Sequence, residues 1–328
     1  MLINFSDPQI RYLIDAANIS QGLIKHQNDF LNDKNFSRFL KNKNLGFPLV
    51  LPLGIKYFDY STVSNIFTIK KKDVQKYIFD TRKSNYIGLN IFFKFGNRFC
   101  SGAKIKNKYK KKFFKIINFN KLEISRINKI KKKGTVGAFQ TRNIPHLGHE
   151  LIIQRFLKKN KYVSVNPLIG MKKYGDCKNE ILGRIFKYFI SLKDYKNKLS
   201  YNPIICNMHY AGAREAIHHC YIRENIGFDY FTIGRDHAGS DQIYPPLKAY
   251  NFVRNNKNKL RIKIFFHKGA YFCQKCNKFL LKNDCKHKNL TEISGTFFRK
   301  ELGMNKIFKY ARIELQKFIK KLNLRLFY

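Results

Sequence analysis

One segment, residues 135–156, constrains the fold of this chain more than any other. Residues 135–139 form an apolar run of strand length, and a polar loop follows them at once. From Leu147 onward apolar residues recur at helical spacing, and Pro145 stands where the first turn of a helix tolerates proline. A strand that leads through a polar loop into a helix is the repeating unit of an α/β sheet. We therefore predict an α/β fold from Gly134 onward.

A second unit of the same kind begins at the apolar run of residues 230–233. This run passes directly into Gly234, Arg235, Asp236 and His237. Loops that follow parallel strands lie together at one edge of such a sheet, which is where ligands bind. We therefore expect the two polar loops to line one ligand site.

The first 133 residues have a different pattern. Short apolar runs alternate there with turn signals, as at residues 47–53, 66–69 and 87–95, which favours a mostly β domain after a helical lead-in. A lysine-rich stretch at residues 104–133 closes at Gly134, and we place a domain boundary there. We predict an N-terminal domain at 1–133, a catalytic domain at 134–290 that ends in a cysteine-rich loop, and a small helical region at 291–328.

The first polar loop carries groups that suit an anion. It opens a helix, so free backbone N–H groups and the positive end of the helix dipole face the ligand. Arg142 can donate to two oxygens of a sulfate or phosphate, and Gln140 and Asn143 can donate amide protons to the same group. His146 and His149 can share one face of the helix. Two histidines at this spacing also occur by chance, as caps or as half of a metal site, but their place beside Arg142 favours a functional role.

The second polar loop combines one cation, one carboxylate and one imidazole in a glycine-flanked turn, residues 233–239. Taken alone, the loop fits a tight turn with a surface ion pair between Arg235 and Asp236. Its position at a strand end, like that of the first loop, favours the other half of a nucleotide site.

Five segments together carry a family resemblance. They are VGAFQTRNIPHLGHE, PLIGMKKYGD, AGAREAIHH, FTIGRDHAG and ISGTFFRKEL, in the order and nearly at the spacing of ATP sulfurylases. The chain resembles that family from about Gly134 to its C-terminus, and less before it. The resemblance implies a Rossmann-like nucleotidyltransferase domain of the HIGH-containing type, preceded by a PUA-like domain. It also implies a sulfate adenylyltransferase, which makes adenosine 5′-phosphosulfate and pyrophosphate from ATP and sulfate, reversibly.

The same resemblance implies roles for the loop residues. The implied catalytic residues, whose histidines contact the ATP phosphates, are Thr141, Arg142, Asn143, His146 and His149. The implied sulfate ligands are Gln140, Arg142 and the backbone N–H of Ala238. The implied nucleotide ligands are Gln140, Thr141, Arg142, Asn143, Gly234, Arg235, Asp236 and His237. Lys173 and Asp176 match a TKxGD-like segment of the family, to which no role is assigned.

These roles agree with the chemistry that the residues allow. A sulfate oxygen can attack the α-phosphorus of ATP in line and displace pyrophosphate without a covalent enzyme intermediate. Sulfate is already ionised and needs no general base, so the protein has to position two anions and neutralise their charge. Arginine, histidine and helix N-termini suit that task, and we expect Mg²⁺ on the phosphates of ATP.

Three of the seven cysteines crowd together, which favours metal binding over a disulfide framework. Cys273, Cys276 and Cys285 form a CxxC followed by a third cysteine, and a fourth ligand would complete a tetrahedral zinc site. Some ATP sulfurylases carry such a zinc site, with a histidine slightly further along, where this chain has Asn289. His287 is the nearest candidate for the fourth ligand of a structural zinc ion. The alternative is three reduced cysteines in a loop.

Composition and two departures from the family pattern leave other functions open. The formal net charge of +44 is typical of proteins that bind nucleic acid, which makes an RNA-binding protein one alternative. The lysines are, however, spread along the whole chain beside many Asn, Ile, Phe and Tyr residues, as drift in an AT-rich genome produces. We therefore do not expect a nucleic-acid partner. Ala213 replaces a usual Pro and His209 stands where Arg is expected, which would weaken anion binding nearby. Another nucleotidyltransferase of the same fold and a degraded enzyme are the remaining alternatives.

The remaining expectations concern location and assembly. No apolar run approaches the roughly 18 residues that a membrane-spanning helix needs, and the N-terminus lacks the order of a signal peptide. We expect a cytoplasmic enzyme of sulfur metabolism with no membrane partner, and the resemblance implies a homo-oligomer. The sequence leaves the direction open, towards sulfate assimilation or towards ATP in a sulfur oxidiser. No GxxxxGK[ST] loop occurs, so we expect no fused kinase.

Overall fold

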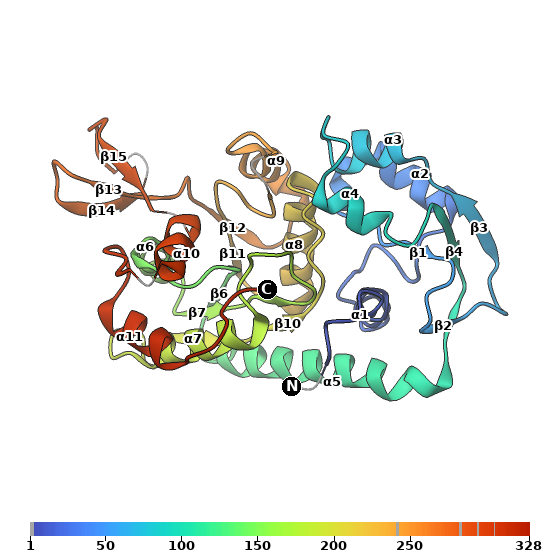
Figure 1. Ribbon diagram of the computed structural model, residues 1–328, viewed down its shortest axis with the longest axis horizontal. Coiled ribbons are helices and arrows are strands. Elements are labelled where there is room, and N and C mark those ends of the chain that lie inside the picture. The colour runs from blue at the N-terminus through green and yellow to red at the C-terminus, as the bar shows by residue number, and fades with distance from the viewer. Residues whose placement is uncertain (1–2, 241–242, 282–283, 294, 305) are drawn as a thin grey trace.

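The computed structural model describes residues 3–240, 243–281, 284–293, 295–304 and 306–328. Figure 1 shows an elongated molecule, with the N-terminal helices and short strands at one end and the strands β13, β14 and β15 at the other. A parallel sheet lies between them. Helix α5 (Asn107–Lys131) runs along the lower side of this view, from the N-terminal part to the sheet. Among the described residues, no helix combines the length and the apolar character that crossing a bilayer requires.

Five parallel strands form the central sheet, in the order β12-β11-β6-β7-β9. The chain starts in the middle at β6, moves outward through β7 to β9, and returns to the other side of β6 with β11 and β12. This is the strand order of doubly wound α/β folds, so the α/β prediction is confirmed. The strands are β6 (Val136–Phe139), β7 (Tyr162–Val165), β9 (Leu199–Tyr201), β11 (Tyr230–Ile233) and β12 (Lys263–Phe266).

Helices cover both faces of the sheet, and β6 is buried along its whole length. Side chains alternate between the faces. Ala138 belongs to a core with α5, α8 and α9, whereas Phe139 belongs to a second core with α6, α7 and α11. Helix α6 approaches so closely that a Cβ on Gly137 would lie 2.3 Å from the ring of Phe156. The helices are α6 (Leu147–Leu157), α7 (Asn179–Ser191), α8 (Ala213–Ile226), α9 (Lys248–Asn255) and α11 (Ile313–Lys321).

The N-terminal part holds more helix than strand, so the prediction of a mostly β domain is wrong. The lysine-rich stretch before Gly134 is mostly α5, whose buried residues include Ile116, Glu123 and Ile127 at helical spacing. Its lysines lie mostly on the exposed side and mask this period in the sequence. Residues 87–95 hold a short helix, because a short apolar run does not distinguish a buried strand from a buried helix.

The remaining N-terminal strands build two small antiparallel sheets, β1-β4-β3 and β2-β5. One hydrophobic core runs from Ile10 of α1 to Ile217 of α8, so this part packs directly on the sheet region. The domain division after residue 133 stays a prediction. The elements are α1 (Ile10–Ser20), α2 (Asp33–Lys41), η1 (Lys43–Leu45), β1 (Leu51–Pro52), β2 (Phe58–Asp59), β3 (Asn65–Thr68), α3 (Lys71–Asp73), η2 (Val74–Ile78), α4 (Ile87–Phe92), β4 (Arg98–Ser101) and β5 (Lys104–Ile105).

After β12 the chain leaves the central sheet and forms the antiparallel sheet β14-β13-β15, which we call the cysteine sheet (residues 270–292). The chain then returns, and α11 packs on α7. An isolated antiparallel β-bridge, made by the backbones of Cys177 and Phe327, holds the C-terminal residues against the loop before α7. The remaining elements are β8 (Leu168–Ile169), β10 (Ile204–Ile205), η3 (Lys257–Lys259), β13 (Ala270–Cys273), β14 (Lys278–Leu281), β15 (Leu290–Glu292) and α10 (Gly295–Gly303).

Candidate active site

Both predicted loops lie at the carboxyl edge of the sheet, where the strand order reverses. The first loop follows β6, and the second follows β11, which pairs directly with β6. Helix α6 begins at Leu147, and His146 caps it: its ring Nδ1 accepts the backbone N–H of His149 at 3.4 Å. In the second loop Ala238 has a left-handed backbone, with φ of 56°. Loops far apart in sequence therefore meet where doubly wound sheets bind their ligands.

The two loops line one cavity of about 290 Å³, which we call the switch-point cavity. It brings together every loop residue that the sequence singled out. They are Gln140, Thr141, Arg142, Asn143, His146, His149, Gly234, Arg235, Asp236, His237 and Ala238. Arg299, which follows the ISGT segment, also lines the cavity, and other elements contribute lining residues that the sequence analysis missed, among them Lys172, Met208, His267 and Glu292.

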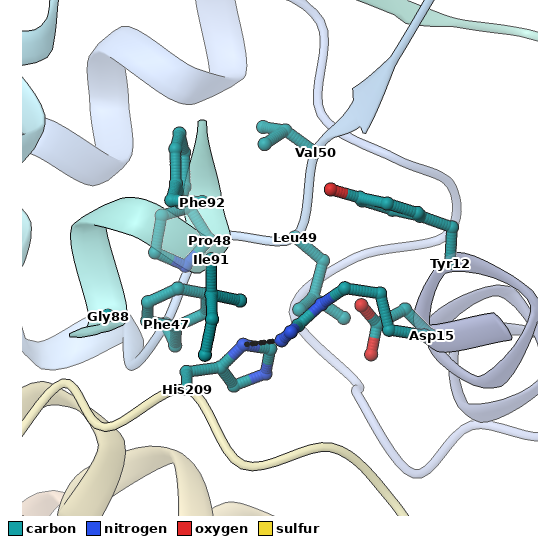
Figure 2. Close-up of a pocket in the computed structure, with 11 residues that line it drawn as sticks. Tyr12, Asp15, Phe47, Pro48, Leu49, Val50, Gly88, Ile91, Phe92 and His209 are labelled. Atoms are coloured by element: carbon teal, nitrogen blue, oxygen red, sulfur yellow. Dashed lines mark hydrogen bonds between the residues drawn. The ribbon is translucent and has the colours of Figure 1, made fainter. Parts of the chain in front are cut away.

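A second and much smaller cavity, of about 20 Å³, lies between α1 and the segment after residue 46. Figure 2 shows His209 beside Phe47 there, with ring centroids 4.0 Å apart, and its Nδ1 lies 3.3 Å from Nη2 of Arg11. A space of this size holds about one water molecule, and no nucleotide. His209, which stands where an arginine was expected, therefore faces this small cavity and does not line the switch-point cavity.

Part of the guanidinium of Arg142 has no hydrogen-bond partner within the described residues. Its Nη2 donates to the carbonyl of Gly239 at 2.7 Å, and the guanidinium lies over the ring of Tyr210, 5.6 Å from the ring centroid. Nη1 lies 3.9 Å from a carboxylate oxygen of Asp176 and has no hydrogen-bond partner among the described residues. A buried donor without a partner is costly, so an anion at Nη1 would stabilise this arrangement.

His146 and His149 stack, with ring centroids 3.9 Å apart. Burial lowers the pKa of His146 to about 3, and burial, together with His146 and His267, lowers the pKa of His149 well below its usual value. Both rings are therefore neutral at pH 7 without a ligand. Since Nδ1 of His146 accepts a backbone N–H, its own ring proton lies on Nε2 and can be donated to an anion.

A buried cluster of polar side chains adjoins the cavity. Glu215 of α8 accepts two backbone N–H groups, each at 2.8 Å, and its Oε1 lies 3.2 Å from Nε2 of His219, which has no hydrogen-bond partner among the described residues. Nδ1 of His219 lies 3.0 Å from Nε2 of His237 and 3.3 Å from Nε2 of Gln140. Because the amide nitrogen of Gln140 can only donate, Nδ1 of His219 accepts from it, and the ring proton of His219 lies on Nε2. The glutamate and histidine four residues apart in AGAREAIHH were the sequence signal for this cluster.

Two contacts join the loops to C-terminal segments. Arg235 and Glu292 of β15 form a two-pronged ion pair, in which Nη1 donates to Oε2 at 2.7 Å and Nη2 donates to Oε1. Arg299 of α10 donates to Oδ1 of Asn143. The cysteine sheet and α10 therefore form part of the cavity wall. Ser294, in the ISGT segment, lies outside the described residues.

The cysteine sheet brings the four predicted metal ligands together. One ligand atom from each of Cys273, Cys276, Cys285 and His287 lies within 4.8 Å of all the others. Nδ1 of His287 is 3.4 Å from the sulfur of Cys273 and 3.3 Å from that of Cys276. Three thiols and one imidazole at these separations fit a tetrahedral zinc shell, whose metal–ligand distances are about 2.0–2.3 Å.

Strand order, a helix N-terminus and a cationic cavity at the switch point together define a doubly wound α/β protein with a site for phosphorylated or similar anionic ligands. A model of the ATP-sulfurylase family matches residues 117–308. The chain belongs to the ATP-sulfurylase family, which is a family of nucleotidyltransferases.

Two relatives align over most of the chain. A sulfate adenylyltransferase of Thermococcus onnurineus (strain NA1) is 30% identical over 311 residues, which are 88% of this chain and 82% of that protein. A sulfate adenylyltransferase of Pyrococcus abyssi (strain GE5 / Orsay) is 30% identical over 310 residues, 87% of this chain and 81% of that protein. Among solved structures, the hexameric APS kinase from Thiobacillus denitrificans aligns with a TM-score of 0.63 at 10% identity, over 98% of this chain and 62% of that chain. At that identity the likeness shows the fold alone.

Proposed function

We propose that this protein is a sulfate adenylyltransferase, which converts ATP and sulfate into adenosine 5′-phosphosulfate and pyrophosphate, reversibly. One observation carries the proposal: both motif-bearing loops line a single cavity at the carboxyl edge of the sheet. This cavity holds cations, neutral imidazoles and a helix N-terminus. Such groups bind anions, so they suit a reaction in which sulfate and the phosphates of ATP must come together. The names of the two relatives support sulfate as the acceptor.

The proposed sulfate ligands are Gln140, Arg142 and the backbone N–H of Ala238. The lack of a hydrogen-bond partner at Nη1 of Arg142, among the described residues, supports this assignment, because a guanidinium can donate to two oxygens of one anion. Nε2 of Gln140 contacts His219 and lies 3.9 Å from the sulfur of Met208. A thioether is a weak acceptor, and a sulfate oxygen in its place would be a stronger one.

The proposed nucleotide ligands come from both loops. Neutral His146 and His149 can donate ring protons to the ATP phosphates, and this hydrogen bonding strengthens as negative charge collects on the departing pyrophosphate. Thr141, Arg142 and Asn143 are the proposed residues around the reacting phosphorus, with Gln140 beside them. The remaining proposed ligands of the nucleotide are Gly234, Arg235, Asp236 and His237.

The proposed chemistry is an in-line displacement at the α-phosphorus of ATP. A sulfate oxygen forms the new bond to phosphorus, while the bond to the bridging oxygen breaks and its electron pair leaves with pyrophosphate. Sulfate is ionised, so the residues of the cavity orient and neutralise the two anions without taking a proton. Mg²⁺ that enters with ATP would neutralise charge on the β and γ phosphates.

We also propose the finer organisation of the molecule. The strand order of the sheet supports a Rossmann-like, HIGH-type catalytic domain at 134–290. An N-terminal domain at 1–133 and a helical region at 291–328 complete the proposed division. The proposed enzyme is a homo-oligomer that acts in sulfate assimilation in the cytoplasm, the compartment that supplies ATP.

The cysteine sheet is the proposed site of a structural zinc ion, bound by Cys273, Cys276, Cys285 and His287. The clustering of the four ligand atoms supports it. Four protein ligands would close the coordination shell, which is typical of a structural zinc ion, whereas a catalytic zinc keeps one position open.

Pyrophosphate-dependent formation of ATP from adenosine 5′-phosphosulfate tests the proposal. Purified protein with Mg²⁺ should produce ATP, and His149→Ala should lower the rate about 100-fold or more, because a donor to the transition state is lost. His26→Ala removes a histidine outside the switch-point cavity and should retain the activity. Folded wild-type protein that binds ATP but makes none in this assay would exclude sulfate chemistry and direct the search to another acceptor.

A further inference from the structure

Lys172 contributes a cation to the switch-point cavity that the roles above leave unused. It follows β8 and lines the cavity together with Leu168 and Met208. Its ζ-nitrogen donates to the carbonyl of Leu168 of β8 at 2.7 Å. The side chain is half-buried, as expected for a lysine that faces an enclosed space.

The ammonium of Lys172 has donors to spare. An ammonium carries three N–H donors, and the contact with Leu168 uses one. No second acceptor contacts the ζ-nitrogen among the described residues. A half-buried ammonium with open donors has lost water on part of its surface, so an anion in the cavity would replace that water.

Several observations connect Lys172 with the proposed sulfate ligands. It shares the cavity lining with Gln140, Arg142 and Met208, whose sulfur lies 3.9 Å from Nε2 of Gln140. The positive charges of Arg142 and Lys172 are close enough that Arg142 lowers the pKa of Lys172, after the larger effect of burial. Lys172 likewise lowers the pKa of His219, the residue that holds Gln140.

Carboxylates near Lys172 leave its ammonium donors unused. Asp176 lies 3.9 Å from Arg142 and accepts from Tyr210 at 3.2 Å. Burial lowers the pKa of Lys172, and the charges of Asp176 and Glu215 partly offset that effect. Neither carboxylate contacts the ζ-nitrogen among the described residues, so an anion in the cavity can accept from its remaining donors.

In the TKxGD-like segment Lys172 occupies the position of the threonine, a neutral residue. We infer that Lys172 is a second sulfate-binding cation, whose ammonium donates to the sulfate oxygens together with Arg142 and Gln140. This inference rests on the proposed function. It assigns to this chain a sulfate site with one more positive charge than the family pattern gives.

The inference predicts a distinct dependence of the sulfate KM on pH. Burial lowers the pKa of Lys172 to about 8, so the ammonium is charged at pH 7 and loses its proton above about pH 8. The sulfate KM should therefore be flat below pH 8 and rise about tenfold per pH unit above it. The charged or titratable groups that face Lys172 are Arg142, Asp176, Cys177, Glu215 and His219.

Three variants test the inference in the forward assay, with sulfate and ATP varied separately. Lys172→Met removes the charge at similar size and should raise the sulfate KM about 10- to 100-fold, the effect of one charge-assisted hydrogen bond, with the ATP KM changed less than about threefold. Lys172→Arg keeps a charge that is not lost near pH 8, so the rise in sulfate KM above pH 8 should disappear. Lys187→Met removes one exposed lysine from α7 and controls for the total charge.

The outcomes separate this inference from the proposed function. ATP formation by the wild type from adenosine 5′-phosphosulfate decides the function, whatever Lys172 does. A sulfate KM that stays within twofold in Lys172→Met, or an ATP KM that rises equally, would overturn the role of Lys172. If Lys172→Met does not fold, Lys172→Arg decides alone, and a sulfate KM that still rises above pH 8 overturns the inference.

Discussion

The switch-point cavity and the cysteine sheet hold their functional residues in opposite ways. The cavity collects residues from Phe139 to Arg299 on many elements, and its histidines are kept neutral by burial. The cysteine sheet takes its four ligands from 15 consecutive positions, and His287 is exposed. The sheet and its helices build the first site, whereas in the second the proposed zinc ion would hold the four ligands together. The two regions should therefore respond differently to acid and to a chelator.

Acid should have the largest effect, through buried histidines in the cavity, such as His146, and through others, such as His209 and His218, that are buried outside it. Burial lowers the pKa of His146 and His218 to about 3, and lowers those of His209 and His219 well below the usual value. In the unfolded chain these groups titrate near 6.5, so below that pH the unfolded state binds more protons. The stabilisation by neutral rings is complete above about pH 6.5 and is lost as the pH falls. Each group costs about 1.4 kcal/mol per pH unit, which sums to several kcal/mol by pH 5.

Urea unfolding at several pH values measures this loss. The free energy of unfolding should fall steeply between pH 6.5 and pH 5, and His218→Gln should reduce the slope by about one proton. A free energy of unfolding that stays constant between pH 6.5 and pH 5 would mean that the buried histidines do not make the protein sensitive to acid, and the predicted difference between the two regions would be wrong.

Removal of the metal should have the next largest effect, confined mostly to the cysteine sheet. We expect about one zinc ion per chain by elemental analysis, and its loss in Cys276→Ser, because structural zinc contributes directly to folding. The melting temperature should fall by several degrees, while ATP formation stays within about tenfold of the wild type. Lys275→Ser, in the same turn, should keep both zinc and stability. Loss of all activity on chelation, with the fold intact, would instead give the metal a catalytic role.

The sequence predicted different parts of the two regions for different physical reasons. Both loops of the cavity were predicted because strand, loop and helix follow one another locally at Gln140 and Gly234. Lys172 and Glu292 were missed because only the tertiary fold brings them to the same wall. The cluster of proposed metal ligands was predicted from the CxxC spacing and the family resemblance, since its members lie close together in the sequence. Helix α5 was missed because its exposed lysines mask the apolar period that its buried face carries.

Glu292 connects the two regions, and its substitution should have the smallest effect. The carboxylate belongs to β15 of the cysteine sheet and pairs with Arg235 of the second loop. Both side chains are about one third exposed, 33% for Arg235 and 39% for Glu292, so the pair contributes about 1 kcal/mol or less to stability. In Glu292→Gln the amide has a similar shape but no charge, so the positive charge of Arg235 is no longer neutralised by a carboxylate and attracts the nucleotide more strongly. The ATP KM should then fall about two- to fivefold at low salt, and the gain should vanish at high salt because of screening.

Glu180→Gln is the matched control, since it removes an exposed carboxylate of α7 far from β15 in the sequence and should leave the ATP KM unchanged. An ATP KM that rises more than tenfold in Glu292→Gln would reverse the interpretation. Glu292 would then hold Arg235 in its working position, and the cysteine sheet would be part of the nucleotide site itself. Removal of the metal can be combined with Glu292→Gln. If metal removal alone lowers the ATP KM, and Glu292→Gln in the metal-free protein lowers it no further, the ion acts on the cavity through the ion pair of Arg235 and Glu292.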